Sequence, residues 1–224
     1  MEQAVNKRIH VIVGHYGSGK TEFAINYALW LKNSYQRVYI VDLDIVNPYF
    51  RTNDVKERLE KLGLSVIASP YASTNVDVPS LPAEINRVFA DKEAAVVFDV
   101  GGDDDGAIAL GRYKPYFDRE QTELLFVMNI YRPMTATAGD ICEMIQGIEA
   151  VSRLKVTALV NSSNLAALST AKETMKGQAV AEETERLTGI PCRYIAVTEA
   201  IKNELPSEYH DRCFCIKRFM ALSF

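Results

Sequence analysis

A glycine-rich stretch near the start of the sequence combines residue types that can hold a phosphate group. Gly14, Gly17 and Gly19 allow the backbone to curl, so that consecutive N–H groups point toward the oxygens of one anion. An apolar run precedes the stretch and an amphipathic run follows it, which predicts a turn between a strand and a helix N-terminus, where anions bind favourably. The residues are Gly14-His15-Tyr16-Gly17-Ser18-Gly19-Lys20-Thr21, whose spacing matches the Walker A motif.

This motif assigns a role to each side chain of a nucleotide-binding phosphate loop. Lys20 is expected to reach the β- and γ-phosphates, and the Thr21 hydroxyl is expected to ligate Mg²⁺. The alternative is a glycine-rich turn that binds nothing, but the flanking strand and helix patterns favour the phosphate site. The predicted cofactor-binding residues of the loop are Gly14, Gly17, Ser18, Gly19, Lys20 and Thr21.

Asp99 supplies a metal anchor for such a site. It ends the apolar run Val96-Val97-Phe98 and begins the pattern Asp99-Val100-Gly101-Gly102. Ligands bind at the carboxyl ends of the strands in open α/β sheets, so Asp99 is expected to hold Mg²⁺ through its water shell. The backbone N–H of Gly102 is expected to contact the γ-phosphate and sense its loss. The alternative role for Asp99 is to cap the next helix.

A second acidic pair, Asp42 and Asp44, follows the apolar run Arg37–Val41. The i, i+2 spacing on an extended chain points both carboxylates to the same side. One could assist Mg²⁺ while the other orients the attacking water, since phosphoryl transfer depends on positioning and charge stabilisation. The alternative is a pair of solvent-exposed acids before a turn at Asn47-Pro48.

The elements that must position these residues alternate along the chain. Short apolar runs separated by longer amphipathic stretches predict βαβ units. We therefore predict a three-layer α/β/α fold with a mostly parallel, doubly wound sheet of about seven strands. The expected strands are Arg8–Val13, Arg37–Val41, Leu64–Ala68, Ala94–Asp99, Glu123–Asn129, Lys155–Val160 and Arg193–Val197. The expected helices are Lys20–Lys32, Thr52–Leu62, Pro82–Ala90, Asp104–Tyr113, Ala136–Ser152 and Ala171–Thr188, with a last helix beginning near Pro206.

The composition limits the function classes. The 224 residues include 25 Lys and Arg against 29 Asp and Glu, a net charge of −4, which argues against a surface built to hold nucleic acid. Hydrophobic residues make up 48% and charged residues 24% of the chain, as in ordinary globular domains. No apolar run approaches the ~18–20 residues that span a bilayer, and no secretory signal is evident. We expect one cytoplasmic domain over residues 1–224.

The order of these features resembles the ParA/MinD-like branch of the P-loop ATPases. That branch shares its fold with nitrogenase iron protein, dethiobiotin synthetase and the signal-recognition GTPases. Three matches carry the resemblance and cover about the first half of the chain: the phosphate loop, Asp42-Leu43-Asp44, and Asp99-Val100-Gly101-Gly102. The resemblance implies that Asp44 positions the hydrolytic water and that Asp42 supports the metal.

The resemblance also bears on the nucleotide and on the oligomer. Asn161 follows a predicted strand at the place where such ATPases contact adenine, and the guanine-reading Asn-Lys-x-Asp motif does not follow that strand. This favours ATP over GTP. Many members carry a second lysine where this chain has His15, so a lysine-based contact across a nucleotide-dependent homodimer is not available here.

Three functions of different classes remain open at this stage. The leading expectation is an Mg²⁺-dependent ATPase of the ParA/MinD type that acts as a nucleotide-dependent switch, with Lys20 and Asp44 as its catalytic residues. A protein partner is expected to dock near the switch, where Tyr49, Phe50 and Arg51 follow one another. The alternatives are a dethiobiotin-synthetase-like ligase or small-molecule phosphotransferase, and an ATP-gated adaptor with little hydrolysis.

The last residues, Cys213–Phe224, are apolar with two cations. We expect a final helix packed on the sheet, and the alternative is an amphipathic segment that attaches to a membrane surface. Cys213 and Cys215 are expected to be structural thiols, because a tetrahedral zinc site needs further partners.

Overall fold

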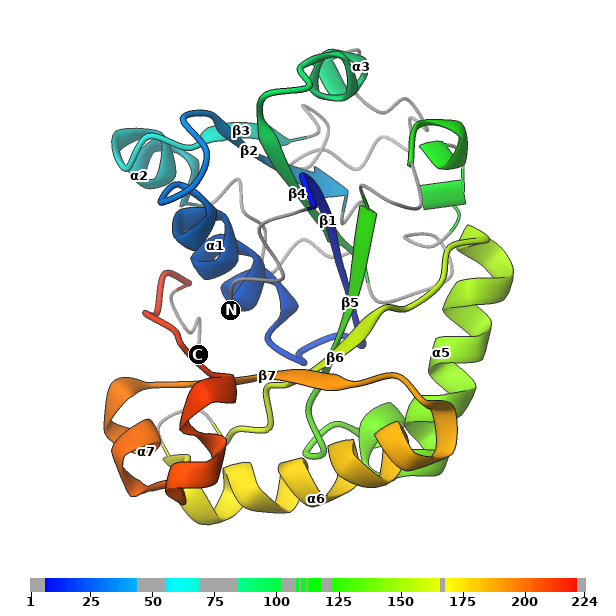
Figure 1. Ribbon diagram of the computed structural model, residues 1–224, viewed down its shortest axis with the longest axis vertical. Helices are drawn as coiled ribbons and strands as arrows, with labels where there is room; N and C mark the ends of the chain where they lie inside the picture. The colour runs from blue at the N-terminus through cyan, green and yellow to red at the C-terminus, as the bar shows by residue number, and fades with distance from the viewer. Residues whose placement is uncertain are drawn as a thin grey trace, which may run out of the picture.

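The computed structural model describes residues 7–43, 55–68, 84–101, 108, 110–111, 113–117, 122–165 and 168–220. Eight strands form one sheet in the order β3-β2-β4-β1-β5-β6-β7-β8, and every neighbouring pair is parallel (Figure 1). The strands are β1 Ile9–Val13, β2 Val38–Leu43, β3 Ser65–Ala68, β4 Ala95–Val100, β5 Thr122–Met128, β6 Ala158–Asn161, β7 Cys192–Val197 and β8 Cys213–Cys215.

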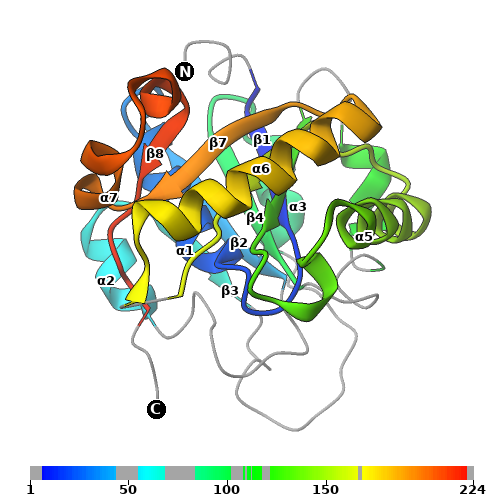
Figure 2. The same cartoon turned by 90° about the horizontal axis from the view of Figure 1, so that it is seen from below.

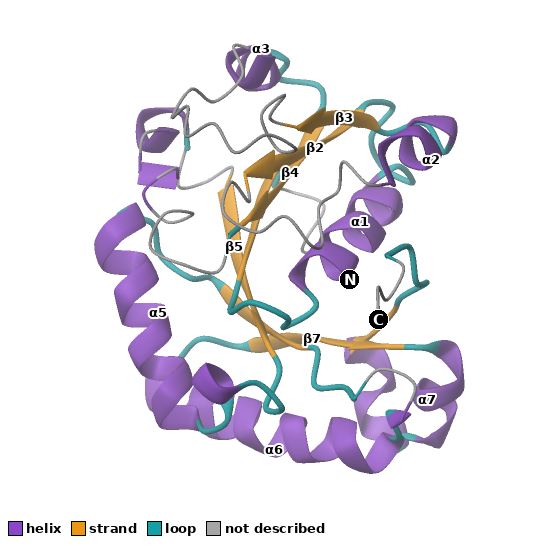
Figure 3. Ribbon diagram, turned by 180° about the vertical axis from the view of Figure 1, so that it is seen from behind, coloured by secondary structure: helices purple, strands orange, loops and turns teal. Residues whose placement is uncertain are grey.

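Helices lie on both faces of this sheet. The α-helices are α1 Lys20–Leu31, α2 Lys56–Lys61, α3 Glu84–Ala90, α5 Ala138–Ser152, α6 Ala171–Thr188 and α7 Glu199–Glu204. Short 3₁₀ turns occupy Lys114–Tyr116, Pro133–Thr135 and Ser207–Arg212. Figures 2 and 3 show α5 and α6 on one side of the sheet and α1 and α2 on the other.

Alternating side chains of the strands produce two cores, one on each face. In β1, Val11 and Val13 face the core shared with α3 and α5, whereas Ile12 faces the core shared with α1. Both faces of the central strands are therefore apolar, which is why their sequences read as continuous hydrophobic runs. The predicted α/β fold class, with helices on both faces of a parallel sheet, is confirmed.

The end of the chain differs from the predicted final helix. After Pro206 the backbone forms a 3₁₀ turn and then β8, whose Cys213 and Phe214 pair beside Ile195 and Ala196 of β7. The backbone N–H and C=O groups along the edge of β7 pair with an eighth strand, whereas a helix could not satisfy these groups. The prediction of a helix was wrong, whereas the prediction that this segment packs against the rest of the fold is correct for Cys213–Met220.

A buried polar cluster lies within the core under α1. Glu123 accepts a hydrogen bond from the Tyr27 hydroxyl at 3.2 Å, lies 3.2 Å from Nδ1 of His10, and pairs with the guanidinium of Arg193. Burial lowers the pKa of His10 to about 3, and the Arg193 cation adds to this effect. His10 is therefore neutral at pH 7, and Arg193 is the cation that compensates Glu123.

No helix in the described part of the chain is both long and apolar enough to cross a membrane. The predicted helix Asp104–Tyr113 is described only at residues 108, 110, 111 and 113, which are helical. Tyr49, Phe50 and Arg51, where a partner is expected to dock, lie outside the described residues.

Candidate functional site

The glycine-rich stretch forms a tight loop between β1 and α1. Gly14, Gly17 and Gly19 have φ values of 150°, 71° and 92°, a region that side chains with a Cβ rarely adopt. The loop also passes close to its neighbours: a Cβ on Gly14 would lie 2.2 Å from the carbonyl oxygen of Val127 in β5. A Cβ on Gly19 would lie 2.8 Å from Oγ of Ser162. The glycines predicted from the motif are therefore required by the backbone path.

Replacing Gly14 with alanine is expected to lower the free energy of unfolding by at least about 2 kcal/mol. Backbone strain at the positive φ and overpacking against the Val127 carbonyl both contribute to this loss. Gly147 in α5 is the matched control, since a Cβ there would meet nothing within 4 Å. Gly147→Ala is expected to stabilise the helix by about 0.5–1 kcal/mol. Chemical denaturation of the two variants checks both values. A Gly14→Ala variant as stable as the wild type would contradict this loop geometry.

Three side chains of the loop are buried at the start of α1. Ser18, Lys20 and Thr21 are at most 6% exposed. The Ser18 amide closes a turn by donating to the carbonyl of His15 at 3.1 Å. The buried Ser18 hydroxyl has no hydrogen-bond partner among the described residues. A loop with no room for a Cβ at Gly14 and Gly19, a buried lysine and a buried hydroxyl without a partner among the described residues fit a bound phosphate chain.

The two acidic strand ends meet beside this loop. Asp42 of β2 and Asp99 of β4 are register partners, and Asp99 in turn pairs with Ile12 of β1, two residues before Gly14. Both aspartates are buried and belong to the face that α1 covers. Two neighbouring carboxylates repel each other when both are ionised. A cation bound between Asp42 and Asp99 would therefore stabilise the ionised form of both. Oxygen ligands are those that Mg²⁺ prefers, and this pair fits that ion.

A loop residue that the sequence analysis did not single out contacts the phosphate loop directly. Arg132 follows β5 and donates from Nε to the carbonyl of Gly17 at 2.9 Å. His15 lies on the same loop, and burial together with the Lys20 and Arg132 cations lowers its pKa. His15 is therefore neutral at pH 7, and Arg132 supplies the second positive charge at this loop. No local sequence signal marks Arg132, because its contact with the loop depends on β5 lying beside β1.

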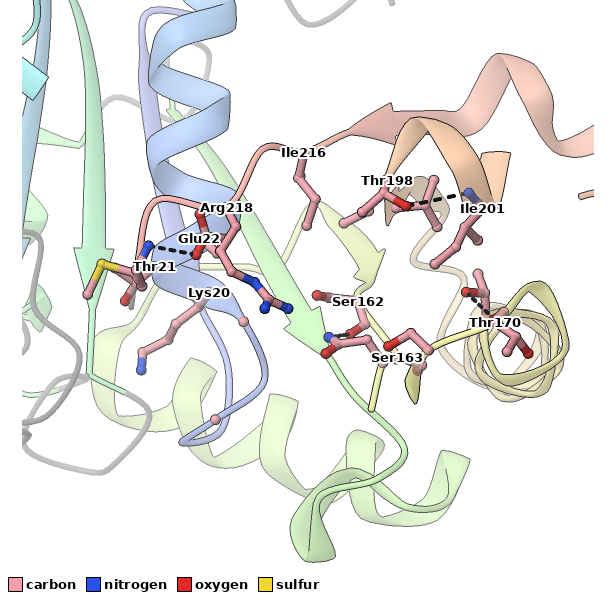
Figure 4. Close-up of a pocket in the computed structure, with 18 of the residues that line it drawn as sticks. Lys20, Thr21, Glu22, Ser162, Ser163, Thr170, Thr198, Ile201, Ile216 and Arg218 are labelled. Atoms are coloured by element: carbon pink, nitrogen blue, oxygen red, sulfur yellow. Dashed lines mark hydrogen bonds between the residues drawn. The ribbon is translucent and has the colours of Figure 1, made fainter. Parts of the chain in front are cut away.

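A cavity of about 690 Å³ opens beside the phosphate loop (Figure 4). Lys20 and Thr21 lie at one end, the loop after β6 with Ser162 and Ser163 forms a wall, and Thr198 and Ile201 lie at the other end. All of these segments except α1 itself follow the carboxyl ends of strands, where open α/β sheets bind ligands. The volume falls within the range of small-molecule sites.

Asn161, the predicted adenine contact, does not line the cavity but forms hydrogen bonds behind its wall. Its amide nitrogen donates to the carbonyl of Thr174 at 3.1 Å and to Gln178 at 3.2 Å, both on α6. Its side-chain oxygen accepts the Ser163 amide at 3.0 Å. Asn161 is fully buried, and these bonds fix the loop that begins at Ser162. The adjacent residues Ser162, Ser163 and Asn164 line the cavity instead.

Two predicted site residues, Asp44 and Gly102, lie outside the described residues. The structure brings together the others: the phosphate loop, Asp42, Asp99 and the strand end at Asn161. Within the described part of the chain, no group of three or more His, Cys, Asp or Glu side chains could hold a metal by itself. A metal held by two aspartates and Thr21 would need oxygens from a ligand or from water.

The eight-stranded parallel sheet and the loop between β1 and α1 define a P-loop NTPase-like fold. No protein-family model and no curated protein sequence matches the chain. Among solved structures, the cell division protein FtsY from Thermotoga maritima matches with a TM-score of 0.57 and 16% identity, over 96% of this chain and 65% of its own. Chloroplast FtsY from Physcomitrella patens matches with a TM-score of 0.53 and 16% identity, over 84% of this chain and 58% of its own.

A third match is the signal recognition particle receptor FtsY from Elizabethkingia anophelis, with a TM-score of 0.50 and 15% identity over 84% of this chain and 57% of its own. The chain thus spans between 57% and 65% of the length of these three proteins. At this level of identity the likeness shows the fold, and the chemistry must be argued from the site.

Proposed function

We propose that this chain is an Mg²⁺-dependent ATP-binding protein that hydrolyses ATP and acts as a nucleotide-dependent switch of the ParA/MinD type. The observation that carries the proposal is the junction of the phosphate loop with the cavity. The loop has the backbone path and the buried Lys20 of a phosphate site, and the cavity beside it has room for the rest of a nucleotide.

Different residues of the chain have different roles in the proposed phosphoryl transfer. Lys20 and the loop amides stabilise charge on the phosphates, and Thr21, Asp42 and Asp99 would hold Mg²⁺. Bound Mg²⁺ supplies charge neutralisation on the phosphate oxygens. Asp44 orients the attacking water, and the backbone of Gly102 contacts the γ-phosphate. Little covalent chemistry is asked of the protein, so its contribution is positioning and electrostatic stabilisation.

GTP is the specific competing nucleotide, because the family that the sequence resembles shares its fold with the signal-recognition GTPases, and the fold matches structures named FtsY, a signal recognition particle receptor. The stretch after β6 reads Asn161-Ser162-Ser163-Asn164 and lacks the Asn-Lys-x-Asp pattern that reads guanine. Asn161 is moreover bonded to α6. We therefore retain ATP as the proposed nucleotide, with the base placed toward Thr198 and Ile201.

Calorimetry with ATP and with GTP, followed by single-turnover hydrolysis in the presence of Mg²⁺, tests this proposal. We expect tighter binding of ATP and slow turnover. Asp44→Ala is expected to retain ATP affinity within about threefold and to lower the hydrolysis rate by roughly 100-fold or more, as for loss of one positioned group. Equal turnover in wild type and Asp44→Ala would remove Asp44 from the mechanism.

The same assay separates the other functions. A large rise in turnover on addition of a metabolite would identify a ligase or small-molecule phosphotransferase. Binding without turnover would identify an ATP-gated adaptor. Gel filtration with ATP, with ADP and without nucleotide tests whether a nucleotide-dependent homodimer forms. Such a dimer must form without a second loop lysine, because His15 occupies that position.

A further inference from the structure

The segment after β8, Ile216–Met220, is called here the strap. It leaves the sheet with the Ile216 amide bonded to the carbonyl of Val197 at 2.8 Å and then crosses α1. Asn26 exchanges two hydrogen bonds of 2.8 Å with the backbone of Lys217. The carboxylate of Glu22 accepts the amides of both Phe219 and Met220. Two side chains one turn apart on α1 thus bind the strap through its main chain.

Apolar contacts hold the far end of the strap. Phe219 and Met220 are buried in the core under α1, and the guanidinium of Arg58 lies 4.6 Å from the centre of the Phe219 ring. The strap is therefore fixed by backbone hydrogen bonds and by these two side chains. The side chain of Arg218 forms none of these hydrogen bonds or apolar contacts. Its charge does act on Glu22: burial raises the pKa of the Glu22 carboxyl, and the Phe219 and Met220 amides and the Arg218 cation oppose that rise. Arg218→Lys keeps this charge, so it separates an effect through Glu22 from loss of the guanidinium.

Arg218 instead lines the cavity beside the phosphate loop. Figure 4 shows its guanidinium between Lys20 and the loop that carries Ser162. The ends of the cavity at Lys20 and at Thr198 lie on opposite sides of this group. Consider a nucleotide with its terminal phosphates at Lys20 and its base toward Thr198. The part of the molecule that joins the phosphates to the base then lies next to Arg218.

The charge of the cavity supports an anionic ligand at this point. Among the described lining residues, the cations are Lys20, Arg132 and Arg218, which come from three separate segments. The described acids that line the cavity are Glu22 and Glu204. Glu22 has both carboxylate oxygens engaged by strap amides, and Glu204 lies at the end of α7. A guanidinium binds phosphate in a planar, two-pronged geometry that suits recognition of a phosphate chain.

We propose that Arg218 is a phosphate-binding residue of the nucleotide site, delivered in cis by the strap. The inference rests on the proposed nucleotide function. Because the strap is bound to Glu22, the residue that follows Lys20-Thr21, nucleotide occupancy and strap position are coupled through a single turn of α1. Binding of the phosphate chain therefore holds the strap against α1, and loss of the nucleotide weakens that contact.

The test is calorimetric titration of wild type, Arg218→Ala, Arg218→Lys and Lys20→Ala with Mg²⁺-ATP, Mg²⁺-ADP and adenosine. Arg218→Ala is expected to weaken ATP and ADP by about 10- to 100-fold, as for loss of one charge-assisted pair, and to leave adenosine unchanged. Arg218→Lys is expected to recover part of the affinity. Lys217→Ala, which removes a neighbouring exposed cation, separates direct contact from a general effect of charge.

The outcomes distinguish this inference from the proposed function. Equal losses of ATP affinity in Arg218→Ala and Lys217→Ala would overturn the direct contact. The same conclusion would follow if Arg218→Ala bound ATP as tightly as the wild type while Lys20→Ala no longer bound it. Failure of the wild type to bind any purine nucleotide would overturn the proposed function and this inference with it. Tryptic cleavage after Arg218 provides an independent readout: ATP is expected to slow it at least fivefold in wild type, and unchanged cleavage with ATP bound would contradict the coupling.

Discussion

Replacing Lys20 with alanine is expected to lower the affinity for ATP by at least about 100-fold, or about 2.7 kcal/mol. Lys20 is the first residue of α1, is 5% exposed, and lines the cavity at the phosphate loop. A charge-assisted bond from a buried ammonium is stronger than one in water, because the surroundings screen it less. Calorimetry with Mg²⁺-ATP measures the change directly.

The matched control for this prediction is Lys172→Ala. Lys172 is an exposed cation on α6 that does not line the cavity, so its loss changes the net charge equally without touching the site. ATP affinity within about twofold of wild type is expected, since an exposed charge outside the site is screened by solvent and salt. Circular dichroism verifies that Lys20→Ala is folded. Retention of full ATP affinity by folded Lys20→Ala would remove the proposed phosphate site.

Replacing Glu123 with alanine is expected to lower the free energy of unfolding by about 3 kcal/mol, the lower end of the range for breaking a buried ion pair. Glu123 is 3% exposed, pairs with the Arg193 guanidinium, and also contacts the His10 ring and the Tyr27 hydroxyl. Its loss leaves the Arg193 cation without its carboxylate and removes the acceptor of the Tyr27 hydroxyl. The value stays near the lower end because the Arg193 side chain is 34% exposed and solvent compensates part of its charge.

Urea denaturation measures this change, with Glu60→Ala as the control. Glu60 forms an i, i+4 pair with Lys56 on the surface of α2, at 4.0 Å, and both side chains are over 40% exposed. Such pairs contribute about 0.3–0.5 kcal/mol, so Glu60→Ala is expected to change stability by no more than that. Similar losses in the two variants would show that the cluster under α1 contributes no more than a surface pair.

The fold class and most elements were predictable because their signals are local. The Walker A spacing places Gly14 and Gly19 where the loop needs positive φ, and Gly17 between them also has positive φ. The alternation of apolar and amphipathic runs follows the geometry of strands and helices. The final helix was not predicted correctly. Whether Cys213–Cys215 forms a helix or a strand depends on the open edge of β7, which no residue near Cys213 in the sequence reveals.

The candidate site divides in the same way. Lys20, Thr21 and the loop glycines could be named from spacing alone, and the carboxyl-edge rule for parallel sheets was enough to place Asp42 and Asp99 near them. Arg132 and Arg218 could not be assigned, because surface arginines are common and their roles depend on which loop lies beside the cavity. Asn161 lies at the strand end where the resemblance implied an adenine contact, and its amide is bonded to α6. Its contact with adenine stays a prediction.

By itself, the sequence determined the phosphate loop, the parallel α/β architecture and the acids at two strand ends, since each depends on residues that are close together in the chain. The tertiary structure decided the pairing of Asp42 with Asp99, the cluster around Glu123, and the strap that brings Arg218 to the cavity. Glu22 and Phe219 are 197 residues apart, and their hydrogen bond exists only because strand order brings the end of the chain onto α1. Contacts of that kind follow from register and packing, which short sequence patterns do not encode.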